Sequence, residues 1–310
     1  MVKQHIVVGS RRSDLALWQS NHVIDLLRQA HPGLTAEIKI ISTKGDQIID
    51  KPLPSIGGKG LFTEALEDAL RTGDIDIAVH SLKDLPTEDA PGLTVGAVPA
   101  RADVSDVLVS RGKHVLETLP KGASVGTSSR RRAAQLLAHR PDLNIIDIRG
   151  NVPTSVEKCL DPDGPYDAIV LAKAGLERLE LTHHISEVLP LETMLPAPGQ
   201  GALGVQCRYD ADSNALLAPI THAETLHAVT AERRFLNRLE AGCSAPVAAL
   251  ATLSADGGTL AMTGRVSMPD GTNLIEVKDS FPPAEAATHG ARMAEQALER
   301  GAEMILEDVK

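Results

Sequence analysis

Basic and hydroxyl side chains cluster directly after short apolar runs. Arg130, Arg131 and Arg132 follow Thr127 and Ser129 and open a stretch with helical periodicity. Arginine is unfavourable in the first turn of a helix, because that end carries the positive pole of the helix dipole. An anion bound there would offset the conflict, since free backbone N–H groups, hydroxyls and guanidinium groups together bind carboxylate or phosphate. A solvated basic helix start is the alternative.

Basic residues also follow other apolar runs. Arg11, Arg12 and Ser13 follow the run that opens the chain, and Lys83 and Arg149 follow two further runs. Ligands of open α/β sheets bind beyond the carboxyl ends of the strands, so we expect these groups to share one rim. Because the positive charges come from several strand ends, a ligand with several carboxylates fits better than a single phosphate.

One acid and one thiol stand out as candidate reactive groups. Asp84 is embedded in the basic rim beside Lys83, where a carboxylate can stabilise a developing cation or move a proton, or simply pair with that lysine. Cys243 follows a predicted helix end, between a glycine and a proline. A loop thiol can be a nucleophile or an attachment point, although a single cysteine is more often a buried small hydrophobe. We expect Cys159 and Cys207 to be buried.

Two other motifs do not predict a site. The glycines of 57–60 lack the Lys-Ser/Thr ending of a phosphate-binding loop. The pair His183 and His184 lacks companion ligands and reads as a surface helix start, and the three cysteines have no metal-ligand spacing. No metal site is expected.

Composition narrows the function classes further. The 310 residues are 43% hydrophobic and 23% charged, which is globular, and the length suits two or three domains. The net charge of −10 and an aromatic content of 2% argue against nucleic-acid binding. The longest uncharged stretches fall short of the roughly 20 apolar residues of a membrane span, and the chain start does not resemble a secretory signal. We therefore expect a cytoplasmic protein that does not bind membranes.

The elements that must position these residues form an α/β pattern. Short β-branched runs alternate with helical periodicity, first within residues 6–79, where a helix is predicted over about 14–30, and again within residues 107–172. This alternation predicts two lobes with parallel or mixed sheets. A helix over 223–239, strands over 247–253, 259–266 and 273–277, and a helix over 284–300 predict a small C-terminal α+β domain with a three-stranded antiparallel sheet.

The two lobes open on similar strand-to-helix turns. Ile6-Val-Val-Gly-Ser-Arg-Arg-Ser enters one helix, and Ala123-Ser-Val-Gly-Thr-Ser-Ser-Arg-Arg-Arg enters another. We interpret this as a weak internal repeat, in which coincidence remains an alternative.

Nine stretches in order along the chain resemble the porphobilinogen deaminase (hydroxymethylbilane synthase) family. They are Ser13 with Leu15–Gln19, Ser42–Asp46, Gly57–Phe62, Ala78–Pro86, Val125–Ser129, Arg131 with Arg132, Arg149–Asn151, Leu195–Gly201 and Glu240–Pro246. The resemblance covers essentially the whole chain. It implies two lobes like type II periplasmic binding proteins and a small C-terminal domain. The expected boundaries are 1–100 with 201–219 for lobe 1, 101–200 for lobe 2 and 220–310 for the cofactor-attachment domain.

The same resemblance implies a transferase of haem biosynthesis that condenses four porphobilinogen molecules onto a covalent dipyrromethane cofactor. Cys243 would hold this cofactor as a thioether. Asp84 would stabilise the azafulvenium cation that forms when porphobilinogen loses ammonia, and assist the later proton loss. Water would then release hydroxymethylbilane. A monomer, and hand-over of the product to uroporphyrinogen III synthase, are expected.

The resemblance also assigns the remaining positions. Residues expected to bind the cofactor are Lys83, Asp84, Thr127, Ser129, Arg131 and Arg132. Residues expected to bind substrate are Arg11, Ser13, Lys59, Phe62, Arg149 and Arg178, where Lys59, Gly60 and Phe62 correspond to a mobile segment.

Two positions depart from the family pattern. Ser155 stands where the family usually has Arg, and losing one charged partner typically costs about 1 to 3 kcal/mol. We expect weaker binding of the cofactor or of the growing chain unless Arg130 or Lys158 substitutes. Asp14 stands where Pro is common, and an acid suits a helix start. The alternative function is a non-catalytic two-lobed anion-binding protein, or a family member whose activity is impaired because Ser155 replaces the arginine. The joint presence of Asp84 and Cys243 argues against a pure binding protein.

Overall fold

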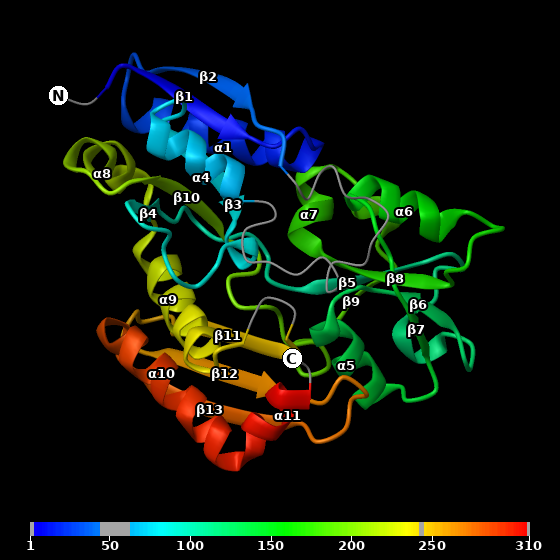
Figure 1. Cartoon of the computed structure of the whole chain (residues 1–310). Helices are drawn as coiled ribbons and strands as arrows, with labels where there is room; N and C mark the ends of the chain where they lie inside the picture. Colours follow the sequence, from blue (N-terminus) through cyan, green and yellow to red (C-terminus); the bar gives the residue numbers. More distant parts are fainter. Residues whose placement is uncertain (1–2, 44–62, 242–244, 309–310) are drawn as a thin grey trace. The chain divides into compact units, whose positions relative to one another are not determined.

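The computed structural model describes residues 3–43, 63–241 and 245–308 (Figure 1). Within these ranges the chain forms two compact units. One comprises the residues up to Ala102 together with Ala202–Leu226, and the other comprises Asp103–Gly201 together with the residues from His227 onward.

The first unit contains a five-stranded mixed sheet in the order β2-β1-β3-β10-β4. The strands are β1 (His5–Ser10), β2 (Thr35–Ile40), β3 (Ile77–Ser81), β4 (Leu93–Ala97) and β10 (Leu203–Arg208), with helices α1 (Asp14–Ala30), α4 (Glu64–Thr72) and α8 (Ala211–Leu217). Helix α1 begins where predicted because the Ser13 Oγ accepts a hydrogen bond from the Ala16 N–H. It buries Val23, Ile24 and Leu27 against the sheet.

The second unit contains a five-stranded sheet in the order β7-β6-β8-β5-β9. The strands are β5 (Asp106–Ser110), β6 (Ser124–Gly126), β7 (Asn144–Ile146), β8 (Ala168–Ala172) and β9 (Glu187–Val188), with helices α5 (Arg130–His139), α6 (Val152–Leu160) and α7 (Lys173–Arg178). Each residue of β5 is buried, which is consistent with the apolar run Val107–Val109 at its centre.

The two five-stranded sheets are built on one plan. In each, the first three strands of the order are parallel, and the fourth, β10 or β5, is antiparallel to the third. At the end of β10, Arg208 pairs with Asp76 just before β3. Correspondingly, Arg111 after β5 pairs with Asp167 just before β8. The weak repeat predicted from the two strand-to-helix turns is therefore confirmed, since β1 and β6 hold the same place in their sheets.

A three-stranded antiparallel sheet in the order β11-β12-β13 completes the second unit. Its strands are β11 (Val247–Leu253), β12 (Leu260–Val266) and β13 (Ile275–Phe281), and helices α9 (Ala223–Arg238) and α10 (Ala286–Ala297) pack on one face (Figure 1). Phe235 of α9 fills the space that the missing side chain of Gly264 leaves in β12. The predicted α/β class with a small α+β domain is confirmed.

Some predicted bounds were wrong. Strand β13 starts and ends later than the predicted 273–277, because its buried alternation continues from Val277 to Phe281. The helix predicted over 284–300 is confirmed as α10 with a short helical turn at each end, and the backbone kinks directly after it, at Gly301 (φ 100°). A last helix, α11 (Glu303–Asp308), follows and was not predicted. Strands β4 and β10 were not predicted, and the division into three domains remains a prediction.

Candidate functional site

The first unit brings four predicted site residues to one edge of its sheet. Arg11 and Ser13 follow β1, while Lys83 and Asp84 lie in the 3-10 turn Leu82–Asp84 that follows β3. Strands β1 and β3 are parallel neighbours, so their carboxyl ends meet at the same edge. Asp84 is exposed, whereas Lys83 and Arg11 are half-buried. The edge therefore offers a carboxylate beside two cations.

Strand β3 also carries a buried histidine near this edge. His80 is 8% exposed. Burial, which is the larger cause, and the nearby Arg11 charge together lower its pKa to about 4, although the neighbouring Gln206 side chain acts in the opposite direction. The His80 side chain is therefore neutral at neutral pH and does not add charge to the edge.

The second unit builds a corresponding edge at the end of β6. The Thr127 Oγ1 accepts a hydrogen bond from the Ser129 N–H at 3.2 Å, and the Ser129 Oγ accepts one from the Arg132 N–H at 3.4 Å. Ser129 is thus the N-cap of α5, and the helix begins at Arg130 as predicted. The hydroxyl-rich turn places all three arginines in the first turn of the helix.

Two further arginines lie beyond the neighbouring parallel strands. Arg149 follows β7, whose end is joined to the β6 turn because the Ser128 Oγ donates to the Ile148 carbonyl at 2.8 Å. Arg178 is the last residue of α7, and its Nη2 donates to the Gly201 carbonyl at 2.9 Å. Burial lowers the pKa of Arg178, and the Glu177 charge opposes this shift. The predicted cations of this unit therefore share one sheet edge.

A buried carboxylate that sequence reasoning missed lies beneath these arginines. Asp106, at the start of β5, is 0% exposed. Its Oδ2 accepts from Arg131 Nη1 at 2.8 Å, and its Oδ1 accepts from Arg132 Nη2 at 2.7 Å and from Gln200 Nε2 at 3.0 Å. Burial alone would raise the pKa of Asp106, but the charges of the two arginines outweigh it and hold the pKa well below its ordinary value.

Asp106 explains part of the unusual helix start. The predicted conflict between arginines and the helix dipole is offset, for Arg131 and Arg132, by an anion of the chain itself. Arg131 is 5% exposed and also donates to the Leu195 carbonyl, so little of it is accessible. The sequence does contain one signal for this buried acid, because Asp106 directly precedes a run of apolar residues. An acid buried with such a run requires charged or hydrogen-bonding partners.

The departure at position 155 lies in helix α6. Ser155 is buried. Lys158, one turn further on, is exposed and donates through Nζ to the Arg149 carbonyl at 2.7 Å. Lys158 is therefore bonded to the backbone of a predicted substrate-binding residue.

The predictions for the three cysteines and for residues 57–62 fall partly within the described residues and partly outside them. Cys159 and Cys207 are buried free thiols, as predicted, and burial raises the pKa of each to about 11. Cys243, Lys59 and Phe62, together with the glycines of 57–60, lie outside the described residues.

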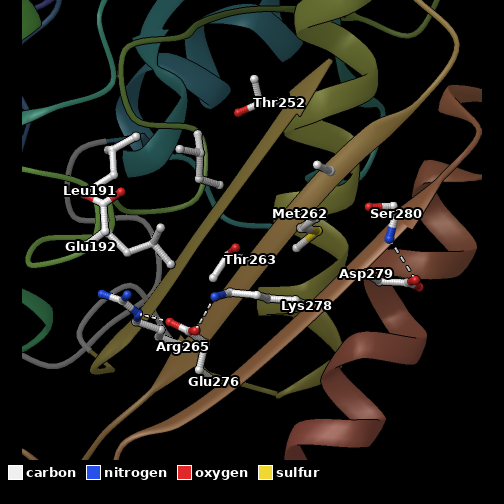
Figure 2. A pocket seen from close by; sticks show the side chains of 13 residues that line it. Leu191, Glu192, Thr252, Met262, Thr263, Arg265, Glu276, Lys278, Asp279 and Ser280 are labelled. Carbon is white, nitrogen blue, oxygen red and sulfur yellow. Dashed lines mark hydrogen bonds and ion pairs between the residues drawn. The ribbon is translucent and has the colours of Figure 1, made fainter. Parts of the chain in front are cut away.

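A separate hollow of about 480 Å³ lies on the open face of the three-stranded sheet (Figure 2). Thr252, Thr263 and Lys278 line it together with Leu191 and Glu192 from the preceding loop. None of the predicted site residues is among its lining residues.

Within 3–43, 63–241 and 245–308, no helix is both long and apolar enough to cross a membrane. The same ranges contain no cluster of three or more histidine, cysteine or acidic side chains arranged to hold a metal ion.

Comparisons with known proteins cover nearly the whole chain. The family model described as the dipyrromethane cofactor-binding domain of porphobilinogen deaminase matches residues 6–215, and the model of that family's C-terminal domain matches residues 226–299. A porphobilinogen deaminase from Syntrophotalea carbinolica is 48% identical over 96% of this chain and 94% of its own. One from Geobacter metallireducens is 46% identical over 100% of this chain and 96% of its own.

Similarity to solved structures is much lower. A PhnD1 structure from Prochlorococcus marinus, in complex with methylphosphonate, is 13% identical with a TM-score of 0.40, covering 77% of this chain and 90% of that chain. This level of similarity carries no inference about the fold or the ligand. The matches to the two family models and the 46–48% identity over nearly the full length confirm the sequence resemblance. The chain belongs to the porphobilinogen deaminase family.

Proposed function

We propose that the protein condenses four porphobilinogen molecules head to tail onto a dipyrromethane bound to Cys243, releasing ammonia and then hydroxymethylbilane. The observation that carries this proposal is the pair of strand-end clusters, one of which holds Asp84 among basic side chains. Both occur in a chain of the porphobilinogen deaminase family.

The donor chemistry of the second unit fits a dipyrromethane. This group carries acetate and propionate carboxylates, and guanidinium forks bind carboxylates well. The donors at the ends of β6, β7 and β8 are Thr127, Ser129, Arg131, Arg132, Arg149 and Arg178. When bound, the cofactor would supply the free pyrrole position to which each new unit is joined. The residues that would hold it are Cys243, through the thioether, and these donors.

Asp106 would prepare two of these donors before the cofactor binds. Arg132 donates to Asp106 through both Nε and Nη2, at 3.1 and 2.7 Å, which fixes the plane of the guanidinium. Only the remaining N–H groups would then be available to a carboxylate. Fixing a side chain in advance lowers the entropy cost of binding.

The first unit would bind the substrate and hold its charge. Arg11 and Ser13 would bind the carboxylates of porphobilinogen, and Lys83 would place a further cation beside Asp84. The Asp84 carboxylate would face the cation that forms as porphobilinogen loses ammonia. After the new carbon–carbon bond forms, Asp84 would assist loss of the proton from the pyrrole carbon.

Ser155, which stands where the family usually has arginine, would affect the affinity for the cofactor or for the growing chain rather than the reaction itself. Lys158 lies one helical turn away and is bonded to the Arg149 backbone, so it supports local compensation by a lysine. Hand-over to uroporphyrinogen III synthase, a monomeric state and a location in the cytoplasm remain predictions.

Replacing Asp84 tests the proposed chemistry. We expect Asp84→Ala to keep its cofactor, measured by intact mass, while ammonia release falls at least ~100-fold, the scale typical of a lost general acid or base. Glu88→Ala is the matched control, because Glu88 is an exposed acid four residues away, and we expect it to turn over normally. Normal ammonia release by Asp84→Ala would refute its role. If the native protein and both variants bind porphobilinogen but release no ammonia, the alternative of a non-catalytic binding protein would be supported.

A further inference from the structure

Helix α5, which begins with the arginines, is fastened to the segment Leu195–Gly201. The Leu195 carbonyl accepts from Arg131 Nη1 at 2.8 Å and from Gln135 Nε2 at 3.0 Å. The Leu195 N–H donates to Gln135 Oε1 at 3.0 Å. Gln135 therefore bonds both backbone groups of one residue, and its side chain is 3% exposed. Such buried, paired hydrogen bonds hold one orientation.

The same segment is fastened on its other side to the three-stranded domain. The Ala249 N–H in β11 donates to the Pro196 carbonyl at 3.0 Å. Glu232 of α9 is 0% exposed, and its two carboxylate oxygens accept from the Gly199 N–H at 2.7 Å and from the Ala251 N–H at 2.9 Å. Segment Leu195–Gly201 thus joins α5 to α9 and β11.

A second connection between α5 and the three-stranded domain does not involve segment Leu195–Gly201. The turn between β12 and β13 lies against α5 (Figure 1), and a Cβ on Gly271 would come within 2.3 Å of the Ala138 backbone nitrogen. Gly271 also has φ of 83°, which favours glycine. Only glycine permits this approach of two backbones.

A third connection runs from β12 to the middle of α5. Arg265 Nη1 donates to Gln135 Oε1 at 3.2 Å, and Arg265 Nε pairs with Glu276 Oε2 at 2.5 Å (Figure 2). Gln135 therefore receives hydrogen bonds from both the segment and the sheet.

We propose that these three connections make helix α5 and the three-stranded domain one rigid body, with Gln135, Glu232 and Gly271 as positioning residues for the cofactor. This inference rests on the proposed function, because the domain includes the sequence position of Cys243, between α9 and β11. The carboxylate-binding start of α5 and the domain that anchors the cofactor then keep a constant separation. The space for each added pyrrole unit must therefore open at another place in the protein, and not between α5 and the three-stranded domain.

Gly271→Ala tests the rigid body, with Gly257→Ala as its matched control. Gly257 lies in the other turn of the same sheet with φ of 73°, and a Cβ there meets nothing within 4 Å. Both variants carry the same backbone strain, so only Gly271→Ala should separate the turn from α5. We expect faster hydrogen exchange in α5 for Gly271→Ala alone. At equal cofactor occupancy by intact mass, we expect kcat/KM to fall about tenfold, a fraction of the hundredfold that a 1 Å misplacement can cost.

Equal exchange in α5 and equal kcat/KM for the two glycine variants would overturn the proposal. Should Gly271→Ala fail to fold, Arg265→Ala removes the hydrogen bond to Gln135, together with the pair to Glu276, and leaves Gly271 unchanged. It should give a smaller rise in α5 exchange and a smaller fall in kcat/KM, and no change in either would also overturn the proposal. Absence of cofactor from the native protein would instead refute the proposed function, while the exchange comparison would still report on the rigid body.

Discussion

Asp106 determines the environment of two arginines at the start of α5. A fully buried carboxylate is costly unless its partners are fixed, and Asp106 has two guanidinium groups and the Gln200 amide. The sequence predicted an anion at this helix start and a set of cations around it. It could not predict that Asp106 is the anion that pairs with Arg131 and Arg132. The residues that interact with Asp106 are 25 to 94 positions away from it, and no local pattern joins them.

His80 provides a pH-dependence prediction for stability. Its native pKa of about 4 lies below the value of about 6.5 in an unfolded chain. As the pH falls between these values, the unfolded chain binds a proton that the native protein does not, so the free energy of unfolding decreases. The decrease reaches up to about 3 kcal/mol near pH 4.

Urea unfolding between pH 4 and 7 measures this effect when native protein is compared with His80→Gln. Other titrating groups contribute equally to both proteins, so the difference in unfolding free energy isolates His80. The native protein should lose stability relative to the variant as the pH falls. A difference that stays constant over this range would contradict a buried neutral imidazole.

At the scale of elements, the strand-to-helix turns depend on a glycine at the strand end. A Cβ on Gly126 would approach the Tyr166 ring to 2.8 Å, and the Tyr166 hydroxyl donates to the Asp147 carbonyl at 2.9 Å. The ring is therefore held in place and cannot move aside freely. We expect Gly126→Ala to destabilise the protein by about 1 to 3 kcal/mol, as overpacking does.

Gly175→Ala is the control for that substitution. Gly175 lies within α7, where a Cβ would meet only Val152 at 3.4 Å, an ordinary contact. Alanine favours helix over glycine by up to about 1 kcal/mol, so its denaturation midpoint should stay unchanged or rise. Equal midpoints for the two variants would mean that Tyr166 accommodates the methyl group.

The elements themselves were predictable to different degrees. Helix α1 and strand β11 match their predicted bounds, because a Ser cap marks the first and a clean run of apolar residues marks the second. Strand β10 was missed because its sequence contains a glycine and directly follows the irregular segment Leu195–Gly201, which is rich in proline and glycine. It pairs between β3 and β4, over a hundred residues earlier in the chain, and only the fold reveals such a pairing.

At the scale of the whole molecule, two sheets of one plan each present a basic edge at the ends of their parallel strands. The strand order, the Arg208–Asp76 and Arg111–Asp167 pairs, and the two serine-capped helices recur in both units. A repeated plan yields repeated basic edges, which would suit the proposed ligand with its many carboxylates. This arrangement accounts for an acidic protein, of net charge −10, that gathers arginine at its strand ends.

The most direct test of the account is the intact mass of the purified protein, measured with and without Cys243→Ser and paired with an aldehyde reagent that colours pyrroles. We predict that the native protein exceeds its sequence mass by one dipyrromethane and gives the pyrrole colour, and that the variant shows neither. An unmodified native mass without colour, persisting after incubation with porphobilinogen, would contradict the account.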